Sequence, residues 1–220
     1  GSEMCIRDSS WAGSQPESMS DYRAKIDSVK QPYVSHETGQ WCAFPNFSEI
    51  RKYTGVNKAK NFEIFRDILN DNHMGSMGHD FMMASGKLQA ICYKHEIEKT
   101  LRTPDYAGFQ LLALNDYSGQ GTALVGLLDV FFEEKGYINA DEFRRFCSPT
   151  VPLARIPKFV YTNDEAFHAD IEVSHFGAAP LQEAKTVYSI KDEYGKVYAH
   201  GTVGTQNIPV CLLYTSPSPR

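Results

Sequence analysis

The amino-acid sequence predicts an α/β protein that continues into an antiparallel β-sandwich. Two short apolar runs that end in polar residues, at 32–41 and 108–116, are typical of buried strands. Between them lie two segments with apolar residues at helical spacing. A boundary at residues 148–157 contains three prolines. Beyond it, apolar and polar residues alternate, which is the period of a half-buried strand.

The first strand holds the most informative residues. Gly39 supplies the turn that ends it, so the Glu37 carboxylate lies where the strand stops, between His36 and Trp41. Strand ends followed by loops are where α/β barrels place their chemistry, and an indole offers a flat apolar face to a sugar ring. The local sequence leaves a second interpretation open, in which Glu37 caps the next helix and Trp41 belongs to the core.

The second strand, residues 108–114, ends in Asn115 and Asp116 and leads into a glycine-rich loop at 117–122. Together with the first strand, this order resembles the C-terminal part of the barrel in family 2 glycoside hydrolases, the β-galactosidase and β-glucuronidase group. The resemblance covers roughly residues 20–205.

What the resemblance implies about the fold is specific. Residues 10–155 would form the C-terminal part of a (β/α)8 TIM barrel with a helical insertion, and residues 156–210 the start of a β-sandwich domain. About seventy residues separate Glu37 from the eighth strand, which is why an insertion is expected. Thr38 stands where many members of the family carry an aromatic residue.

The resemblance also implies the chemistry, that of a retaining glycoside hydrolase acting on β-linked sugars, most closely a β-galactosidase-like exo-enzyme. Glu37 matches the nucleophile of the family. His36, Asn115 and Asp116 would orient sugar hydroxyls, and Trp41 would form an apolar wall. No organic cofactor is needed, and the sequence shows no set of metal ligands.

One catalytic group is missing from this expectation. Retaining glycosidases need a second carboxyl as acid and base, about 5–5.5 Å from the nucleophile. In the family this Glu usually follows an Asn on the fourth strand, and no Asn-Glu pair occurs in the 220 residues. We therefore expect the chain alone to be inactive. A barrel that binds carbohydrate without hydrolysing it, or acts as a scaffold, remains the alternative.

The sequences of the two ends of the chain indicate that these end residues are not encoded by the gene itself. Residues 1–9 can be encoded by a DNA whose complementary strand, read in another frame, encodes residues 211–218. That DNA resembles the adapter of transposase-made sequencing libraries. Residues 1–9 and 211–220 are therefore excluded from the fold prediction, and the remainder is expected to be an internal fragment of a longer gene product.

Composition excludes several classes of partner. The formal net charge is -5 and no basic tract is present, so nothing favours nucleic acid electrostatically. No apolar run reaches the ~18 residues of a membrane span. Outside the excluded ends, Cys42, Cys92 and Cys147 are too widely spaced for a metal knuckle or a disulfide framework. Carbohydrate is the predicted partner. Oligomeric state and compartment stay open, with periplasm and secretion both compatible.

Helices and turns are predicted from spacing and caps. We expect helices beginning near Asn46 or Ser48 and over residues 60–72, 79–102 and 141–146, and a hairpin turn at 191–195. In the longest helix, the apolar side is expected to include Leu88, while Glu96 and Glu98 are expected on a solvated face.

Overall fold

The chain folds into two compact units that alternate along the sequence. The computed structural model describes residues 15–117, 123–210 and 212–216, the last stretch as backbone. The first unit combines Gly1–Tyr33, Glu98–Gly108 and Phe146–Arg220, and the second combines Val34–Ile97 and Phe109–Arg145.

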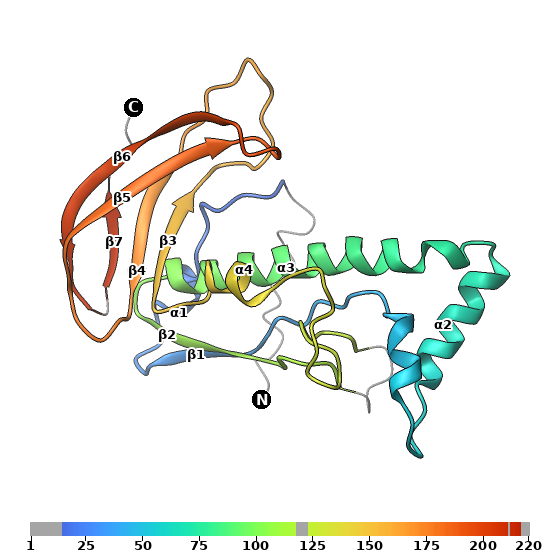
Figure 1. Cartoon of the computed structure of the whole chain (residues 1–220). Helices are drawn as coiled ribbons and strands as arrows, with labels where there is room; N and C mark the ends of the chain where they lie inside the picture. The colour runs from blue at the N-terminus through green and yellow to red at the C-terminus, as the bar shows by residue number, and fades with distance from the viewer. Residues whose placement is uncertain (1–14, 118–122, 211, 217–220) are drawn as a thin grey trace. The chain divides into compact units, whose positions relative to one another are not determined.

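The helices and strands can be followed by colour in Figure 1. In chain order they are α1 (Arg23–Ile26), β1 (Tyr33–Thr38), the 3-10 helix η3 (Phe47–Lys52), α2 (Lys60–Asp71), η4 (Gly75–Met77), α3 (Gly78–Arg102), β2 (Tyr106–Leu111), α4 (Ala140–Arg144), β3 (Thr150–Arg155), β4 (Asp170–His175), β5 (Leu181–Lys191), β6 (Val197–Ile208) and β7 (Leu212–Ser216).

The barrel prediction is wrong for the part of the chain that the structure describes. The strands form separate sheets of two, three and two members, in the orders β1-β2, β3-β4-β7 and β5-β6. A closed barrel requires every strand to pair on both sides, whereas β1 and β2 pair with each other and leave two edges. The two apolar runs identified strands correctly, but a strand pattern does not specify the number of neighbours.

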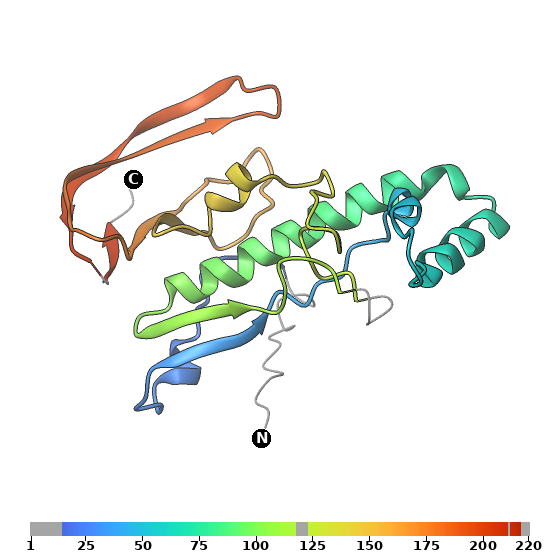
Figure 2. The same ribbon diagram turned by 60° about the horizontal axis from the view of Figure 1, so that its bottom comes forward.

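Strands β1 and β2 run in the same direction, as Figure 2 shows. Parallel neighbours need a long crossover, and η3, α2, η4 and α3 lie between them in the chain. Past the end of the ladder, the Leu112 N–H donates to the Thr38 carbonyl at 2.9 Å. The continuation of β2 therefore lies beside the end of β1, where Glu37 is found.

The helices of the second unit match the predicted spacing closely. The helices expected over 60–72 and 79–102 are confirmed as α2 and α3. The Asn46 side chain accepts from the Ser48 N–H at the start of η3, so Asn46 is the cap. A core of Ala59, Phe62 and Leu124 packs against η3. The Phe44 ring extends this core through edge-on contacts with three further rings. These are Phe47, Phe65 and Phe81.

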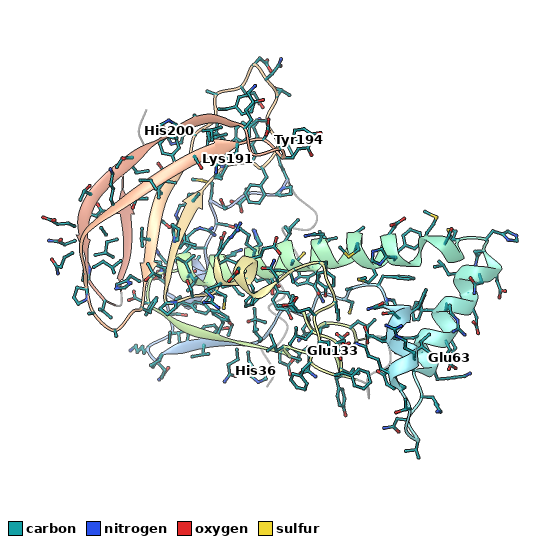
Figure 3. All side chains as sticks on the ribbon, viewed as in Figure 1. His36, Glu63, Glu133, Lys191, Tyr194 and His200 are labelled. Carbon is teal, nitrogen blue, oxygen red and sulfur yellow. The ribbon has the colours of Figure 1, made fainter. Side chains whose placement is uncertain are left out.

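Strands β3 to β7 of the first unit form antiparallel pairs. β3 pairs with β4, and β5 pairs with β6 around the predicted turn, so the hairpin is confirmed and is longer than expected. At the turn, Gly195 has φ +83° and its N–H donates to the Asp192 carbonyl. Figure 3 shows Lys191, Tyr194 and His200 along this hairpin, and the Tyr194 side chain is almost fully exposed.

Strand β7 comes from residues that the sequence assigns to an adapter. Its register places residue 214 opposite Val173 of β4 and residue 216 opposite Ile171. A strand edge offers unpaired N–H and C=O groups to any extended segment, whatever its sequence. The pairing therefore follows from the exposed edge of β4, and the adapter origin stays a prediction.

Tight packing of α3 makes one position in it sensitive to a single methyl group. A Cβ at Gly86 would lie 2.1 Å from Cδ1 of Tyr137, whose ring is fully buried. We expect Gly86→Ala to destabilise the protein by ~1–3 kcal/mol through overpacking, although alanine is the better helix former by about 1 kcal/mol. The shift of the urea unfolding midpoint measures this.

The matched control is Gly55→Ala, because no atom lies within 4 Å of a Cβ at that position. Its unfolding midpoint should match that of the wild type within error. Equal midpoints for both variants would contradict the packing of Tyr137 on α3.

Candidate functional site

Glu37 lies near the end of β1 in an uncommon backbone conformation. Its φ is +57°, in the left-handed region that residues other than glycine rarely occupy. The Gln40 amide donates from Nε2 to Glu37 Oε2 at 3.0 Å, and Nδ1 of His36 lies 3.8 Å from Oε1. The Glu37 side chain is 30% exposed. The carboxylate is therefore held at one oxygen and still reaches solvent.

The neighbouring imidazole points away from the protein. Figure 3 shows His36 projecting from β1 into open space, and 62% of its side chain is exposed. Figure 3 also shows Glu63 on α2 and Glu133 beyond β2, so these two carboxylates come from other elements. Of the labelled residues, His36 alone belongs to the segment that carries Glu37.

The segment that follows Glu37 is irregular, and helix α3 supplies its hydrogen-bond partners. Glu96 accepts from the Gly39 N–H through Oε2 and from Trp41 Nε1 through Oε1, both at 2.9 Å. Gln89 donates from Nε2 to the Trp41 carbonyl at 2.6 Å. Backbone groups outside regular ladders need such partners, because an unpaired buried N–H or C=O is costly.

These partners lie along one side of α3. Ser85, Gln89, Tyr93 and Glu96 follow one another at steps of four, four and three, which places them on a single helical face. Ser85 Oγ accepts from the N–H of Phe44 at 2.7 Å. The α3 polar stripe, as we call these four residues, therefore spans the chain from residue 39 to residue 44.

Tyr93 completes the stripe by shape as well as by hydrogen bonding. A Cβ at Gly39 would lie 2.0 Å from the Tyr93 ring, and Gly39 itself has φ +86°, so glycine is required there twice over. The buried Tyr93 hydroxyl donates to the Val125 carbonyl at 2.8 Å. Burial, and then the nearby Glu96 carboxylate, raise the pKa of Tyr93, so the hydroxyl remains a donor.

The two α3 expectations that concern individual faces are wrong. Glu96 is half-buried as an anchor and does not lie on a solvated face, and Glu98 lies 3.7 Å from the buried Arg102 guanidinium. Leu88, expected on the buried side, is 58% exposed. The signal that identifies the stripe is the spacing of polar head groups at positions 85, 89, 93 and 96, which the apolar pattern obscures.

The two residues at the end of the second strand have different surroundings. Asp116 is 2% exposed, its Oδ2 lies 2.6 Å from the Lys135 ammonium, and its Oδ1 accepts from the Gly126 N–H at 2.8 Å. Burial raises the pKa of Asp116, and Lys135 opposes that rise. Asn115 is half-buried and donates to the backbone carbonyl of Asp116 at 2.9 Å.

His36, Glu37 and Trp41 are thus brought together in one segment, whereas Asn115 and Asp116 are only adjacent to it through the neighbouring strand. In the described part of the chain, neither Asn115 nor Asp116 forms a hydrogen bond or ion pair with Glu37. The ion pair with Lys135 gives Asp116 a structural role. Its role in orienting a sugar hydroxyl stays a prediction.

A second ionic cluster surrounds the loop beyond residue 128. The Asp129 carboxylate is buried, accepts from the Phe131 and Glu133 N–H groups, and pairs with the Lys52 ammonium. Burial acts to raise the pKa of Asp129, but the Lys52 ammonium and the two backbone donors outweigh it and lower the pKa. Lys52 lies 2.7 Å from Glu133 as well.

Glu49 of η3 is a buried acid that feels the charges of the same cluster. Its side chain is 1% exposed, and within the described residues Oε2 has no hydrogen-bond partner. Burial first, and then the Asp129 charge, raise the pKa of Glu49 to about 7, although Lys135 and Lys52 oppose the rise. This buried acid therefore changes its charge near neutral pH.

Metal ligands are not grouped in the part of the chain that the structure describes. No three His, Cys, Asp or Glu side chains come together in a way that could hold a metal ion in those residues. The free thiols of Cys42, Cys92 and Cys147 are likewise separate. Over the same described ranges, we find no helix with both the length and the apolar character needed to cross a lipid bilayer.

Comparison with known proteins gives one local similarity. Residues 165–215 match the model of a family described as a domain of unknown function, DUF8488. A search of curated proteins finds no match to the chain. The matched range contains β4, β5 and β6 and most of β7, and lies outside the segment that carries Glu37.

The raised pKa of Glu49 predicts that replacing this residue by glutamine stabilises the protein at high pH and not at low pH. A folded pKa of about 7 against 4.5 for the free side chain means that the folded state loses stability as pH rises through this range. Glu49→Gln should therefore raise the free energy of unfolding at pH 8 by up to about 3 kcal/mol and have little effect at pH 5. Chemical unfolding at both pH values measures the difference.

Glu63→Gln serves as the control, because Glu63 pairs with the largely exposed Lys60 on the surface of α2. Such a pair contributes about 0–1 kcal/mol, so this variant should change little at either pH. A Glu49→Gln effect of equal size at pH 5 and pH 8 would contradict the raised pKa.

Proposed function

We propose that this chain contributes the nucleophile of a retaining glycoside hydrolase acting on β-linked sugars, of the β-galactosidase-like kind, and that Glu37 is that nucleophile. The observation that carries the proposal is the state of Glu37. Its carboxylate is fixed, partly exposed to solvent, and presented from a strand end on a left-handed backbone. The resemblance to family 2 glycoside hydrolases supports the same residue.

Glu37 has a strained backbone conformation, as His73, Asp105, Phe132 and Glu183 also have among the described residues. A non-glycine residue at positive φ costs about 1 kcal/mol or more, and such positions concentrate at functional sites. A helix-capping role, the alternative left open by the sequence, would place the Glu37 carboxylate on backbone N–H groups. Its hydrogen-bond partner is the Gln40 side chain, and η3 begins with Asn46 as cap.

The geometry fits the first step of a double displacement. Oε2 accepts the Gln40 hydrogen bond, which restrains the Glu37 carboxylate and leaves Oε1 to attack the anomeric carbon. The glycosidic C–O bond breaks as the new C–O bond to Glu37 forms, and the departing oxygen takes a proton from a second carboxyl, which the family resemblance expects outside these 220 residues. Water then hydrolyses the glycosyl-enzyme with the same carboxyl as base.

The remaining residues of the site would bind the sugar. Trp41 has its indole N–H fixed by Glu96, so the ring can present a defined face to a pyranose. The exposed His36 and the half-buried Asn115 are suited to hydrogen bonding with hydroxyls. The predicted partner is therefore a carbohydrate, and no cofactor enters the steps.

The acid and base cannot be Glu96 in this geometry. Both of its oxygens already accept hydrogen bonds from the Glu37 segment, so it acts as an anchor. This observation is the specific support for the second candidate function, a protein that binds carbohydrate through Trp41 and His36 without hydrolysing it.

Leaving groups of low pKa need no protonation, so an activated sugar tests Glu37 without the acid.

The test is covalent labelling with a dinitrophenyl β-galactoside that carries fluorine next to the anomeric carbon. Such a probe forms a glycosyl-enzyme that hydrolyses slowly. We expect mass spectrometry to find one sugar unit on the peptide that contains Glu37, and no label in Glu37→Gln. Glu63→Gln should be labelled at the wild-type rate, because Glu63 lies on α2.

Two other results would each decide the matter. No label in a sample shown by circular dichroism to be folded, or a label on another residue, would rule out Glu37 as nucleophile. Reversible binding of the same β-galactoside without label would favour the carbohydrate-binding alternative.

A further inference from the structure

The hydrogen bonds of Glu96 enclose one residue of the site. Its two oxygens accept from donors on residues 39 and 41, so the backbone and the ring on either side of Gln40 are both tied to α3. Gln40 is also the residue whose amide holds Glu37 Oε2. Glu96 of α3 is therefore connected to the candidate nucleophile Glu37 through Gln40, the residue between its two hydrogen-bond donors.

We propose that Glu96 is a positioning residue of the site, one that sets the orientation of both the Glu37 carboxylate and the Trp41 ring. The part that concerns Glu37 rests on the function proposed above, whereas the part that concerns Trp41 does not. Glu96 acts through Gly39, Gln40 and Trp41, and its carboxylate oxygens are taken up by their donors.

The chemistry of the clamp requires a carboxylate of this length. Two N–H donors meet the two oxygens of Glu96, and a carboxylate can accept at both. A glutamine at this position keeps one acceptor and places an NH2 group against the other donor. An aspartate is one methylene shorter and cannot reach both donors from the same turn of α3.

Loss of the clamp should change the site without unfolding the unit. Gln89 continues to hold the Trp41 carbonyl, Tyr93 still fills the space at Gly39, and Ser85 still accepts from the Phe44 N–H. These contacts keep residues 39–44 on α3. What is lost is the fixed distance between the Gly39 N–H and the indole, and with it the placement of Gln40.

The first experiment reads the clamp at Trp41 directly. The sequence contains two tryptophans, so Trp11→Phe leaves Trp41 as the only source of an indole N–H resonance in the full chain. In this background we expect the resonance to show protection from solvent exchange. Glu96→Gln should shift it and speed its exchange about tenfold, because the indole N–H then faces either a neutral oxygen or an NH2 group in place of a charged acceptor.

The second experiment reads the effect on Glu37. The rate of labelling by the fluorinated dinitrophenyl galactoside should fall about 100-fold in Glu96→Gln, the loss typical of a misplaced reacting group. Ser85→Ala removes another hydrogen bond of the α3 polar stripe outside the clamp. It should lower the unfolding midpoint to a similar extent while slowing the labelling no more than a few-fold.

The outcomes separate this inference from the proposed function. An unchanged Trp41 resonance in Glu96→Gln overturns the clamp. Equal labelling rates in wild type and Glu96→Gln overturn the positioning of Glu37 while leaving its nucleophilic role in place. No labelling of folded wild type, together with a shifted Trp41 resonance, overturns the nucleophile and leaves the positioning of Trp41 supported.

Discussion

The hydrogen bonds between the α3 polar stripe and the chain that follows β1 are the interaction on which the second unit depends. Residues 39–44 lie outside the strands, and apart from the Ala43 N–H, which donates to the Leu124 carbonyl, the backbone bonds described for them go to side chains of α3. Gln89 makes three hydrogen bonds. Its buried amide donates to the Trp41 and Leu124 carbonyls and accepts from the Tyr137 hydroxyl. One side chain thus joins three separate segments.

This support explains how a strained residue can persist beside the stripe. Glu37 at φ +57° is energetically unfavourable unless neighbouring contacts determine the backbone. Glu96 and Tyr93 provide those contacts from a helix, which is stiffer than a loop. A site supported by a regular element is held more accurately than one supported by its own turn.

Local features of the fold were predictable because they depend on neighbours in sequence. The spacing of Phe62, Phe65 and Leu69 predicts α2 within a residue at its C-terminal end, and Gly195 marks the hairpin turn. Pairing is different, because the sequence pattern of β1 does not state whether it has one neighbour or two. The barrel prediction failed at that step, where partners far apart in sequence decide the outcome.

The candidate site shows the same division. His36, Glu37 and Trp41 follow from one run of sequence. The ion pair of Asp116 and Lys135 and the exposure of Leu88 depend on which segments meet α3 and the loop before residue 126. The charge and hydropathy of a residue do not predict its burial here, because a Glu or Lys can be solvated or can be buried with a partner, and the sequence does not distinguish the two.

The stripe also bears on how freely this site can diverge. Ser85 holds the N–H of residue 44 and Gln89 holds the carbonyl of residue 41. Every amino acid offers such a carbonyl, and every one except proline offers such an N–H. The shape of the segment is therefore encoded in the helix. Gly39, Gln40, Trp41 and Phe44 have roles of their own, and Ala43 is buried. The exposed Cys42 is therefore the position of the segment at which another side chain could be displayed with no change in the path of the backbone.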